Sequence, residues 1–445
     1  MRSTPKAKRA FIETYGCQMN VADTELMFGV LARDGYVRAE GPADADVMLV
    51  NTCAVRDNAE QRVIGRVGDL LRFKRPGDVL GVVGCMAQRL GPALLEQLPR
   101  VDLVVGPDAY RSLPDLVGDA QAGRRGAETG FRSWEHYEDV PAVREPGATQ
   151  LVTVQRGCDY RCTFCIVPYT RGPERSRTLQ DVVAEIRHLA ETGTSEVTLL
   201  GQTVNSYHDG SHDFADLLRA AGGVDGIRRV RFTSPYPTEF TDRVVEAMAG
   251  TPAVCEHVHL PAQSGSNAVL RRMLRRYTRE EYLAVVARLR AAVPGITFST
   301  DLIVGFPGET EAQFAETLTL VEDAGFDDAY TFKYSPREGT PATRLRDHVE
   351  DAVASERLAR LVDAVRGQAR RRNVARVGSV HEVLIERPAR RGGAMLARTR
   401  TNHLVLVDVP AADAGQYRTV RLTGTTGSTF TGSLVSPALR ELAIA

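Results

Sequence analysis

The residues with the clearest chemical potential are three cysteines in the run VQRGCDYRCTFCIVPYTRG, namely Cys158, Cys162 and Cys165. Their spacing, C-x3-C-x2-C, supplies one ligand fewer than the four that hold an electron-transfer iron–sulfur cluster. A 4Fe–4S cluster held by three thiolates keeps one iron open for a small molecule. The alternative is a structural zinc site, but such sites pair two knuckles into four ligands, and no second knuckle lies nearby in the sequence. The spacing therefore favours an iron–sulfur cluster with one open iron.

Three further cysteines each follow a short apolar or β-branched run: FIETYGC ends at Cys17, DVMLVNTC at Cys53 and VLGVVGC at Cys85. Helix-like stretches lie between these runs, and alternating strands and helices predict a parallel α/β sheet. In such a sheet the carboxyl ends of neighbouring strands meet at one edge. Although a single free cysteine is usually a small buried apolar residue, three in the same position predict a second three-thiolate cluster. Cys255 has no such neighbours and is predicted to be a core residue.

The elements that must position the central cysteines are predicted from residue 151 to about residue 370. Six strand-like runs recur there: LVTVQR, EVTLL, RRVRFT, EHVHL, TFSTDLIV and AYTFKY. Helix-patterned stretches such as LQDVVAEIRHLAETG and REEYLAVVARLRAAVPG lie between them, each ended by Gly. Six βα units predict a partial barrel. Because barrel chemistry gathers at the C-terminal ends of the strands, Cys158 lies where a reaction centre is expected.

Taken together, the motifs resemble a known family. ETYGCQMN, NTCAVRDNAEQRV, GCMAQR and CDYRCTFCIVPYTRGPERSR, followed by a basic β-rich tail, are similar to segments of the radical S-adenosylmethionine (SAM) methylthiotransferases. The resemblance covers nearly the whole chain and is closest to the branch that modifies tRNA. It implies an α/β fold class with an N-terminal parallel α/β domain, a central partial (β/α)6 radical SAM barrel and a C-terminal small β-barrel of the TRAM type.

The resemblance also implies two 4Fe–4S clusters and two molecules of SAM, one a methyl donor and the other a radical source. One cluster would bind the SAM that is cleaved reductively to a deoxyadenosyl radical, and the other would hold the sulfur that is methylated. The substrate would be N6-isopentenyladenosine on the 3′ side of the tRNA anticodon, and its carbon 2 would exchange C–H for S–CH3. The cofactors would carry out the bond breaking and bond formation. The implied metal ligands are Cys17, Cys53, Cys85, Cys158, Cys162 and Cys165. The expected partners are tRNA and an electron donor such as flavodoxin or ferredoxin, and we expect a monomer.

Motifs that follow the later barrel strands are candidates for holding SAM. A glycine permits close backbone approach, and amide side chains can bond the methionine amino or ribose groups. Each motif alone is weak, because Gly and Asn after a strand usually indicate a turn, but they recur at successive strand ends. No catalytic residue is assigned beyond the cluster ligands. The residues predicted to contact SAM are Gly201, Gln202, Asn205, Ser234, Gln263, Asp301 and Gly305.

Other functions stay open at this stage. One related branch modifies an aspartate of a ribosomal protein and usually has a Lys-Asn type motif after Gly-Cys, whereas this chain has YGCQMN. Another branch acts on threonylcarbamoyladenosine in tRNA, and its first motif is usually closer to LGCKVN. A non-catalytic iron–sulfur protein that binds RNA or senses redox state would explain the cysteines and the basic tail. It would not explain two sites with open irons.

The C-terminal section is basic. Residues 366–400 hold ten Arg against Glu382 and Glu386, a local net charge of +8. Short alternating strands (VHEVLIE, NHLVLVDV and YRTVRLTG) predict a small β-barrel, and such a barrel with a basic face is a common nucleic-acid module. A merely solvated charged face usually mixes both signs, so the charge pattern favours RNA contact.

The length and composition of the chain indicate how many domains to expect and what kind of protein it is. The 445 residues predict several domains: residues 1–125 (α/β domain with the second cluster), 126–148 (a linker rich in Gly, Pro and charge), 149–372 (barrel) and 373–443 (TRAM-like barrel). The formal net charge is zero, so RNA affinity must come from a local patch. The sequence has no apolar run of membrane-spanning length and no recognisable signal peptide. We therefore expect a cytoplasmic protein with no membrane partner.

Overall fold

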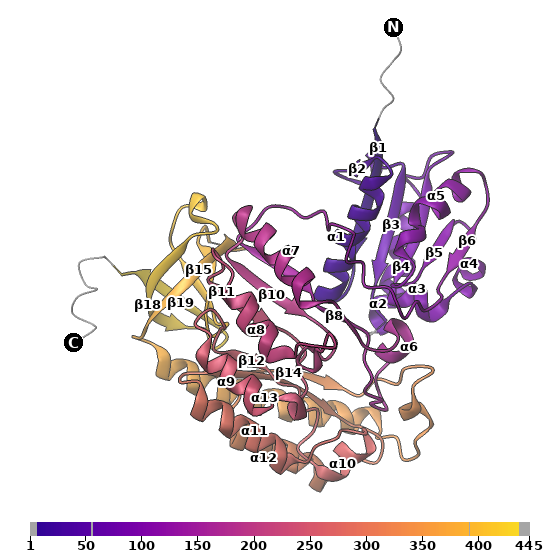
Figure 1. Ribbon diagram of the computed structural model, residues 1–445. Coiled ribbons are helices and arrows are strands. Elements are labelled where there is room, and N and C mark those ends of the chain that lie inside the picture. Colours follow the sequence, from indigo (N-terminus) through magenta and orange to yellow (C-terminus); the bar gives the residue numbers. More distant parts are fainter. Residues whose placement is uncertain (1–6, 55–56, 391, 436–445) are drawn as a thin grey trace.

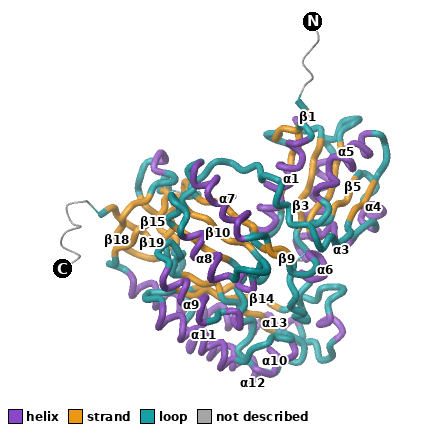
Figure 2. The backbone as a smooth tube through the Cα atoms, in the orientation of Figure 1, coloured by secondary structure: helices purple, strands orange, loops and turns teal. Residues whose placement is uncertain are grey.

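Three structural units follow one another along the chain in the computed structural model (Figure 1), which describes residues 7–54, 57–390 and 392–435. The N-terminal unit is an α/β sheet domain, the central unit is a half-open α/β barrel, and the C-terminal unit is a small β-barrel. Most helices of the central unit lie along its outer side (Figure 2). The predicted fold class is therefore confirmed. The helices of the described ranges lack the combination of length and apolarity that a membrane crossing requires.

The N-terminal sheet has six parallel strands in the order β2-β1-β3-β4-β5-β6. Strands β3 and β4 are buried along their whole length, because separate apolar clusters cover the two faces of the sheet. The strands are β1 (Lys8–Thr14), β2 (Tyr36–Arg38), β3 (Val47–Thr52), β4 (Val79–Gly84), β5 (Leu103–Val105) and β6 (Gly126–Glu128). The helices are α1 (Gln18–Arg33), η1 (Pro42–Asp44), α2 (Asp57–Leu70), α3 (Cys85–Leu90), α4 (Ala93–Gln97), η2 (Tyr110–Ser112) and α5 (Leu113–Gln121).

The predicted linker, residues 126–148, needs one correction. Its first three residues form the edge strand β6, which pairs in parallel with β5. Parallel pairing with β5 and the packing of Ala127 on an apolar cluster hold this strand in the sheet, and Gly-Ala-Glu carries no alternating apolar pattern that would predict a strand. The other domain boundaries stay predictions, and residues 1–6 and 436–443 of the two terminal domains lie outside the described residues.

The central unit contains the six expected parallel strands: β7 (Thr149–Thr153), β10 (Glu196–Leu200), β11 (Arg229–Phe232), β12 (His257–His259), β13 (Thr297–Val304) and β14 (Asp328–Lys333). They form two sheets, β7-β10-β11 and β12-β13-β14, joined by a parallel bridge between Val230 and Val254. A short antiparallel pair, β8 (Gln155–Arg156) and β9 (Arg175–Ser176), flanks the cysteine loop. This arrangement is the partial barrel that the sequence predicts.

Four helices of the central unit begin at threonine caps. The side chains of Thr178, Thr241, Thr278 and Thr310 accept hydrogen bonds from backbone N–H groups of the first turns of α7, α9, α11 and α12. These caps fix where each helix starts and therefore where each preceding loop ends. The helices are α6 (Val167–Arg171), α7 (Leu179–Glu191), η3 (Val204–Ser206), α8 (Phe214–Gly222), η4 (Pro237–Glu239), α9 (Asp242–Gly250), α10 (Asn267–Arg272), α11 (Arg279–Ala292), α12 (Glu311–Ala324), η5 (Pro341–Arg344) and α13 (Asp351–Arg376).

The C-terminal unit is a closed barrel in the order β15-β16-β17-β19-β18 around an apolar core. Its elements are β15 (Val380–Pro388), β16 (Met395–Thr399), β17 (Leu404–Val407), η6 (Ala411–Asp413), β18 (Tyr417–Thr425) and β19 (Thr429–Leu434). It docks on the central unit through arginines: Arg400 pairs with Glu256 at 2.7 Å, and the fully buried Arg229 donates to the carbonyl oxygen of Arg398 at 2.9 Å. The two barrels therefore share a polar interface.

Candidate functional site

The strand order of the N-terminal sheet brings its three cysteines to one edge. Strands β1, β3 and β4 are direct neighbours, and Cys17, Cys53 and Cys85 follow their carboxyl ends. Gly16 permits the close approach: at its φ of +144°, a Cβ atom would lie 2.8 Å from Cβ of Cys53. The expected convergence at this edge is therefore present in the geometry. That these thiols bind iron stays a prediction here.

Two buried asparagines hold the loops of this edge together. Asn20 Nδ2 donates to Asn51 Oδ1 and to the carbonyl oxygen of Thr52, both at 3.1 Å, and Asn51 Nδ2 donates back to the carbonyl oxygen of Asn20 at 2.7 Å. Both side chains are completely buried. Cys17 Sγ also donates to Asn20 Oδ1 at 3.3 Å. These asparagines were missed as site residues, although both stand in the cysteine motifs ETYGCQMN and NTC.

The N-terminal thiols differ in acidity. A hydrogen bond from Cys53, opposed by desolvation and aided by the charge of Arg171, lowers the pKa of Cys17 to about 6. Burial instead raises the pKa of the Cys85 thiol. The site therefore combines one acidified thiol with one thiol that needs a bound cation to lose its proton.

The central cysteines lie on the loop between β8 and α6. The backbone N–H of Cys165 donates to the carbonyl oxygen of Cys162 at 3.0 Å, and the backbone N–H of Cys158 donates to the carbonyl oxygen of Gly172 at 3.1 Å, so the loop folds back on itself. Burial raises the pKa of Cys158, and burial together with the charge of Cys162 raises the pKa of Cys165 to about 12. Without a metal, these two thiols stay protonated.

Each cysteine set receives one buried arginine. Arg171 Nε donates to Cys85 Sγ at 3.3 Å, and Arg275 Nη1 donates to Cys162 Sγ at 3.2 Å. Neither arginine is a neighbour of its cysteine in sequence, so sequence reasoning missed both. Among the described residues no three His, Cys, Asp or Glu side chains are arranged to hold one metal ion. The thiolates of a four-iron cluster bind different irons, so they need not point to a single centre.

Of the residues predicted to contact SAM, Gln202 and Asp301 have the most suitable surroundings. Gln202 Oε1 is buried and has no hydrogen-bond partner within the described ranges, which is costly unless a ligand donates to it. Asp301 is partly exposed on β13, and its Oδ2 lies 3.4 Å from His259 Nε2. Two further candidates, Ser234 and Gln263, have positive φ angles of 56° and 67°. Such strain in non-glycine residues concentrates at functional sites.

The other three predicted SAM contacts have structural partners. Asn205 exchanges two hydrogen bonds with the backbone of Tyr236, at 2.7 and 2.9 Å. Gly305 has a φ of +70°, and a Cβ atom there would lie 2.6 Å from Cβ of Ala354, so this glycine allows α13 to pack closely. Gly201 is buried at the end of β10. A direct contact of these residues with SAM stays a prediction.

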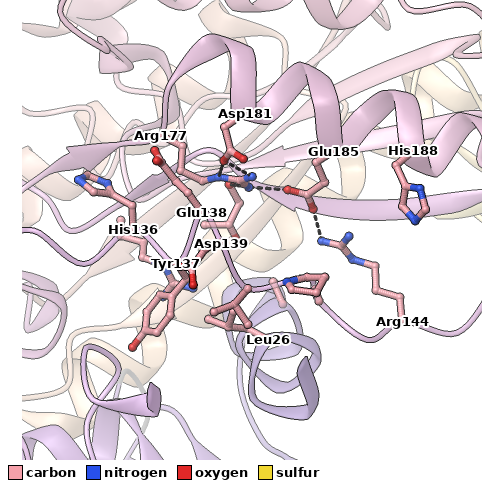
Figure 3. A pocket seen from close by; sticks show the side chains of 16 residues that line it. Leu26, His136, Tyr137, Glu138, Asp139, Arg144, Arg177, Asp181, Glu185 and His188 are labelled. Atoms are coloured by element: carbon pink, nitrogen blue, oxygen red, sulfur yellow. Dashed lines mark hydrogen bonds and ion pairs between the residues drawn. The ribbon is translucent and has the colours of Figure 1, made fainter. Parts of the chain in front are cut away.

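Two pockets lie at domain boundaries, and neither is lined by a cysteine. One, of about 330 Å³, lies between α1, residues 136–142 and α7 (Figure 3). Its charged side chains pair with one another, since Glu185 lies 2.5 Å from both Arg144 and Arg177. The other, of about 730 Å³, lies between β14, α13 and the C-terminal barrel. Its lining includes Arg366, Arg370 and Arg398.

Two family models match parts of this chain, and several known proteins are similar to it over nearly its whole length. Residues 152–321 match the Radical SAM superfamily, and residues 9–106 match the Uncharacterized protein family UPF0004. A protein of Alkalilimnicola ehrlichii named tRNA-2-methylthio-N(6)-dimethylallyladenosine synthase is 42% identical over 96% of this chain and 97% of its own length. Proteins of the same name from Chloroherpeton thalassium (42%; 96% of each chain) and Geobacillus kaustophilus (43%; 98% of this chain and 84% of that one) are similar to the same degree.

Solved structures share the fold. The radical SAM methyltransferase TsrM from Kitasatospora setae, with cobalamin and a [4Fe-4S] cluster bound, aligns with a TM-score of 0.56 at 17% identity, over 76% of this chain and 77% of that chain. The cobalamin-dependent SAM radical enzyme OxsB aligns with a TM-score of 0.52 at 12% identity, over 80% of this chain and 56% of that chain. At such low identity the likeness extends to the fold alone.

Proposed function

This chain belongs to the family of the tRNA-2-methylthio-N(6)-dimethylallyladenosine synthases, and we propose that it methylthiolates carbon 2 of N6-isopentenyladenosine on the 3′ side of the tRNA anticodon. It is a radical SAM enzyme, with SAM and 4Fe–4S clusters as cofactors, and it methylthiolates tRNA. The finer proposal is that two clusters and two SAM molecules take part. It is supported chiefly by the second set of cysteines, Cys17, Cys53 and Cys85, at three adjacent strand ends.

The residues present fit the two clusters. Cys158, Cys162 and Cys165 would hold one, and Cys17, Cys53 and Cys85 the other, because each set offers three thiols and leaves one iron without a protein ligand. Iron would replace the protons that burial retains on Cys85 and Cys165. When bound beside SAM, such a cluster supplies the electron for reductive cleavage of the sulfonium bond.

The chain itself orients the reactants and shields them. Gln202 is proposed to accept a hydrogen bond from SAM, and the buried Oε1 that lacks a partner among the described residues supports this role. Tyr160, within the cysteine loop, stacks on Tyr236 with ring centroids 3.9 Å apart, and Arg275 lies over the ring of Tyr236. These side chains are proposed to limit the access of water to the cysteine loop.

The substrate's backbone is proposed to bind in the 730 Å³ pocket between the two barrels. Arg366 and Arg370 lie there, exposed and one turn apart on α13, without an ion pair to any described residue. Tyr330 is 57% exposed in the same pocket and offers a ring on which a base can stack. The target adenosine is in a single-stranded loop, so it can leave the stack without breaking a duplex. An external donor such as flavodoxin or ferredoxin is proposed to supply electrons.

The decisive test is nucleoside mass spectrometry of total tRNA from cells with and without the gene, and from cells complemented with the Cys158→Ala or Cys17→Ala variant. We expect 2-methylthio-N6-isopentenyladenosine to disappear without the gene and in both variants, while N6-isopentenyladenosine accumulates. Loss of a methylthiolated threonylcarbamoyladenosine instead would point to the other tRNA branch. Unchanged tRNA would contradict the proposal, and mass spectrometry of ribosomal proteins would then test the aspartate-modifying branch.

A further inference from the structure

Arg171 connects the two cysteine sites. It is the last residue of α6, the helix that follows the loop of Cys158, Cys162 and Cys165. Helix α6 lies next to α3 of the N-terminal unit (Figure 1), and the Arg171 side chain, 4% exposed, reaches across this boundary. Its Nε donates to Cys85 Sγ at 3.3 Å, and its Nη2 donates to Asp23 Oδ2 at 2.7 Å. The loop of one site therefore supplies a hydrogen-bond donor to the other.

One donor of this guanidinium is left over. Arg171 Nη1 is buried and has no hydrogen-bond partner in the described part of the chain. A buried, permanently charged group with an orphan donor is costly, and such a group in a native protein requires an explanation. The same guanidinium already contacts a sulfur atom, since Cys85 Sγ lies 3.3 Å from Nε. The chemical class that would satisfy Nη1 there is an anionic sulfur.

We propose that Arg171 is a positioning residue for the N-terminal site: it fixes Cys85 through Nε and directs Nη1 at the anionic sulfur, sulfide or a sulfur substrate, that this site holds. This inference rests on the proposed function, because it needs a cluster on Cys17, Cys53 and Cys85. The donors and the positive charge favour the state with one more electron, so Arg171 raises the reduction potential of that cluster. The helix that follows the central cysteine loop thereby influences the electronics of the N-terminal site through one side chain.

The ion pairs around Asp23 provide a matched control. Asp23 is completely buried and pairs with two arginines, Arg171 at 2.7 Å and Arg156 at 2.9 Å. The variant R171Q leaves Asp23 paired with Arg156, and R156Q leaves it paired with Arg171. Each variant therefore removes one positive charge from the same carboxylate and leaves no unpaired buried charge. Only R171Q also removes a donor to a cysteine sulfur.

The test is an anaerobic redox titration followed by electron paramagnetic resonance. It uses the full-length, reconstituted protein in which Cys158, Cys162 and Cys165 are replaced by Ala, so that the only cluster signal comes from the N-terminal site. Into this background are placed R171Q, R171K and R156Q, and iron and sulfide contents are measured alongside. We expect R171Q to lower the reduced-to-oxidised ratio at a fixed potential at least tenfold, about 59 mV for one electron. We expect R171K, which keeps the charge, to lie between R171Q and the unchanged background, and R156Q to shift the ratio less than threefold.

Each result has a distinct meaning. An R171Q titration that overlays the background would overturn the role of Arg171, and so would an R156Q shift as large as that of R171Q. If R171Q holds no iron while R156Q holds a full complement, the guanidinium is needed to build the site, which supports the proposal. If both variants lose their iron alike, the effect belongs to the ion pairs of Asp23 and the proposal fails. A background protein without iron would instead refute the two-cluster part of the proposed function.

Discussion

Asp23 and Arg156, 133 positions apart in the chain, form a buried ion pair with an Oδ1–Nη1 distance of 2.9 Å. Asp23 comes from α1 of the N-terminal sheet, and Arg156 from the short strand β8 just before the cysteine loop. Neither side chain is more than 7% exposed. The pair therefore fixes the N-terminal unit on the base of the loop that carries the central cysteines.

Replacing Asp23 by Asn should destabilise the protein strongly. Two guanidiniums, Arg156 and Arg171, would be left buried without their carboxylate, and breaking such a pair from one side costs about 3–5 kcal/mol. The measurement is anaerobic urea unfolding of the apoprotein, read at the first transition, because a protein of several units need not unfold in one step. The control is Asp139→Asn: Asp139 is 62% exposed where it pairs with Arg33, so we expect less than about 1 kcal/mol. Equal losses in the two variants would contradict the prediction.

Iron content should follow the two cysteine sets separately. The reconstituted full-length protein is expected to hold about eight irons, and replacing Cys17, Cys53 and Cys85 together by Ala should leave about four. Iron and labile sulfide are determined by colorimetry and Mössbauer spectroscopy. Cys255, 2% exposed in the core, is the control, and Cys255→Ala should leave the iron content unchanged. An unaltered iron content in the triple variant would remove the second cluster.

Substitution of Gln202 should weaken SAM binding. Its buried Oε1 has no partner among the described residues, so Gln202→Ala removes an acceptor that only a ligand can use. One hydrogen bond to a charged donor corresponds to roughly a tenfold loss of affinity. Anaerobic equilibrium dialysis with the cluster-loaded protein gives the dissociation constant, with the exposed Gln180→Ala as control. An unchanged constant for Gln202→Ala would exclude Gln202 from the SAM site.

The fold of the C-terminal unit should weaken in mild acid. Burial, together with the charge of Arg376, lowers the pKa of His403 from 6.5 to about 4. The unfolded chain therefore binds a proton before the folded protein does, and stability is lost as the pH falls from about 6.5 toward 4. The loss is at most about 3 kcal/mol, since one pKa unit corresponds to about 1.4 kcal/mol. Thermal unfolding between pH 7.5 and 4.5 should show a flatter profile for His403→Gln than for the exposed control His188→Gln; parallel profiles would count against His403.

Charge removal in the pocket between the barrels should weaken tRNA binding in a salt-dependent way. If Arg366 and Arg370 each neutralise one phosphate, the double variant to Gln should flatten the plot of log affinity against log salt by about two units of slope. Fluorescence anisotropy with labelled tRNA at several salt concentrations gives this slope. Arg187→Gln, exposed on α7 outside this pocket, should leave it unchanged. An unaltered slope in the double variant would place the RNA elsewhere.

Most of the fold can be predicted from the sequence, because each of the predicted strands is indicated by a residue pattern within the strand itself. The barrel strands EVTLL and TFSTDLIV coincide with β10 and β13, since short runs rich in β-branched and apolar residues indicate strands. The convergence of Cys17, Cys53 and Cys85 follows from the same reasoning, once three adjacent parallel strands are assumed. Strand β6, with the sequence Gly-Ala-Glu, has no such pattern; it pairs with β5 at the sheet edge, where Ala127 packs on an apolar cluster.

The remaining site residues could not be predicted, because their partners are remote in sequence. Arg171 contacts Cys85 and Arg275 contacts Cys162 only after separate units have packed, and no periodicity encodes such contacts. Asn205 and Gly305 were expected to touch a ligand. Their contact with SAM stays a prediction; in the described structure Asn205 bonds to the backbone of Tyr236, and Gly305 makes room for Ala354. A sequence motif predicts that a residue lies at the edge of a sheet, but it does not predict which neighbouring group the residue contacts.

Helix α13 is one unbroken element of 26 residues, Asp351–Arg376, which runs from the barrel to the first strand of the C-terminal unit. At 1.5 Å per residue it is a rigid rod of about 39 Å. The same rod carries Arg366 and Arg370 along the pocket between the two barrels. In the proposed function, one rigid helix therefore sets the distance between the point where RNA is held and the point where it is modified. The protein would then select its nucleotide by this distance along the RNA, in addition to recognising the base.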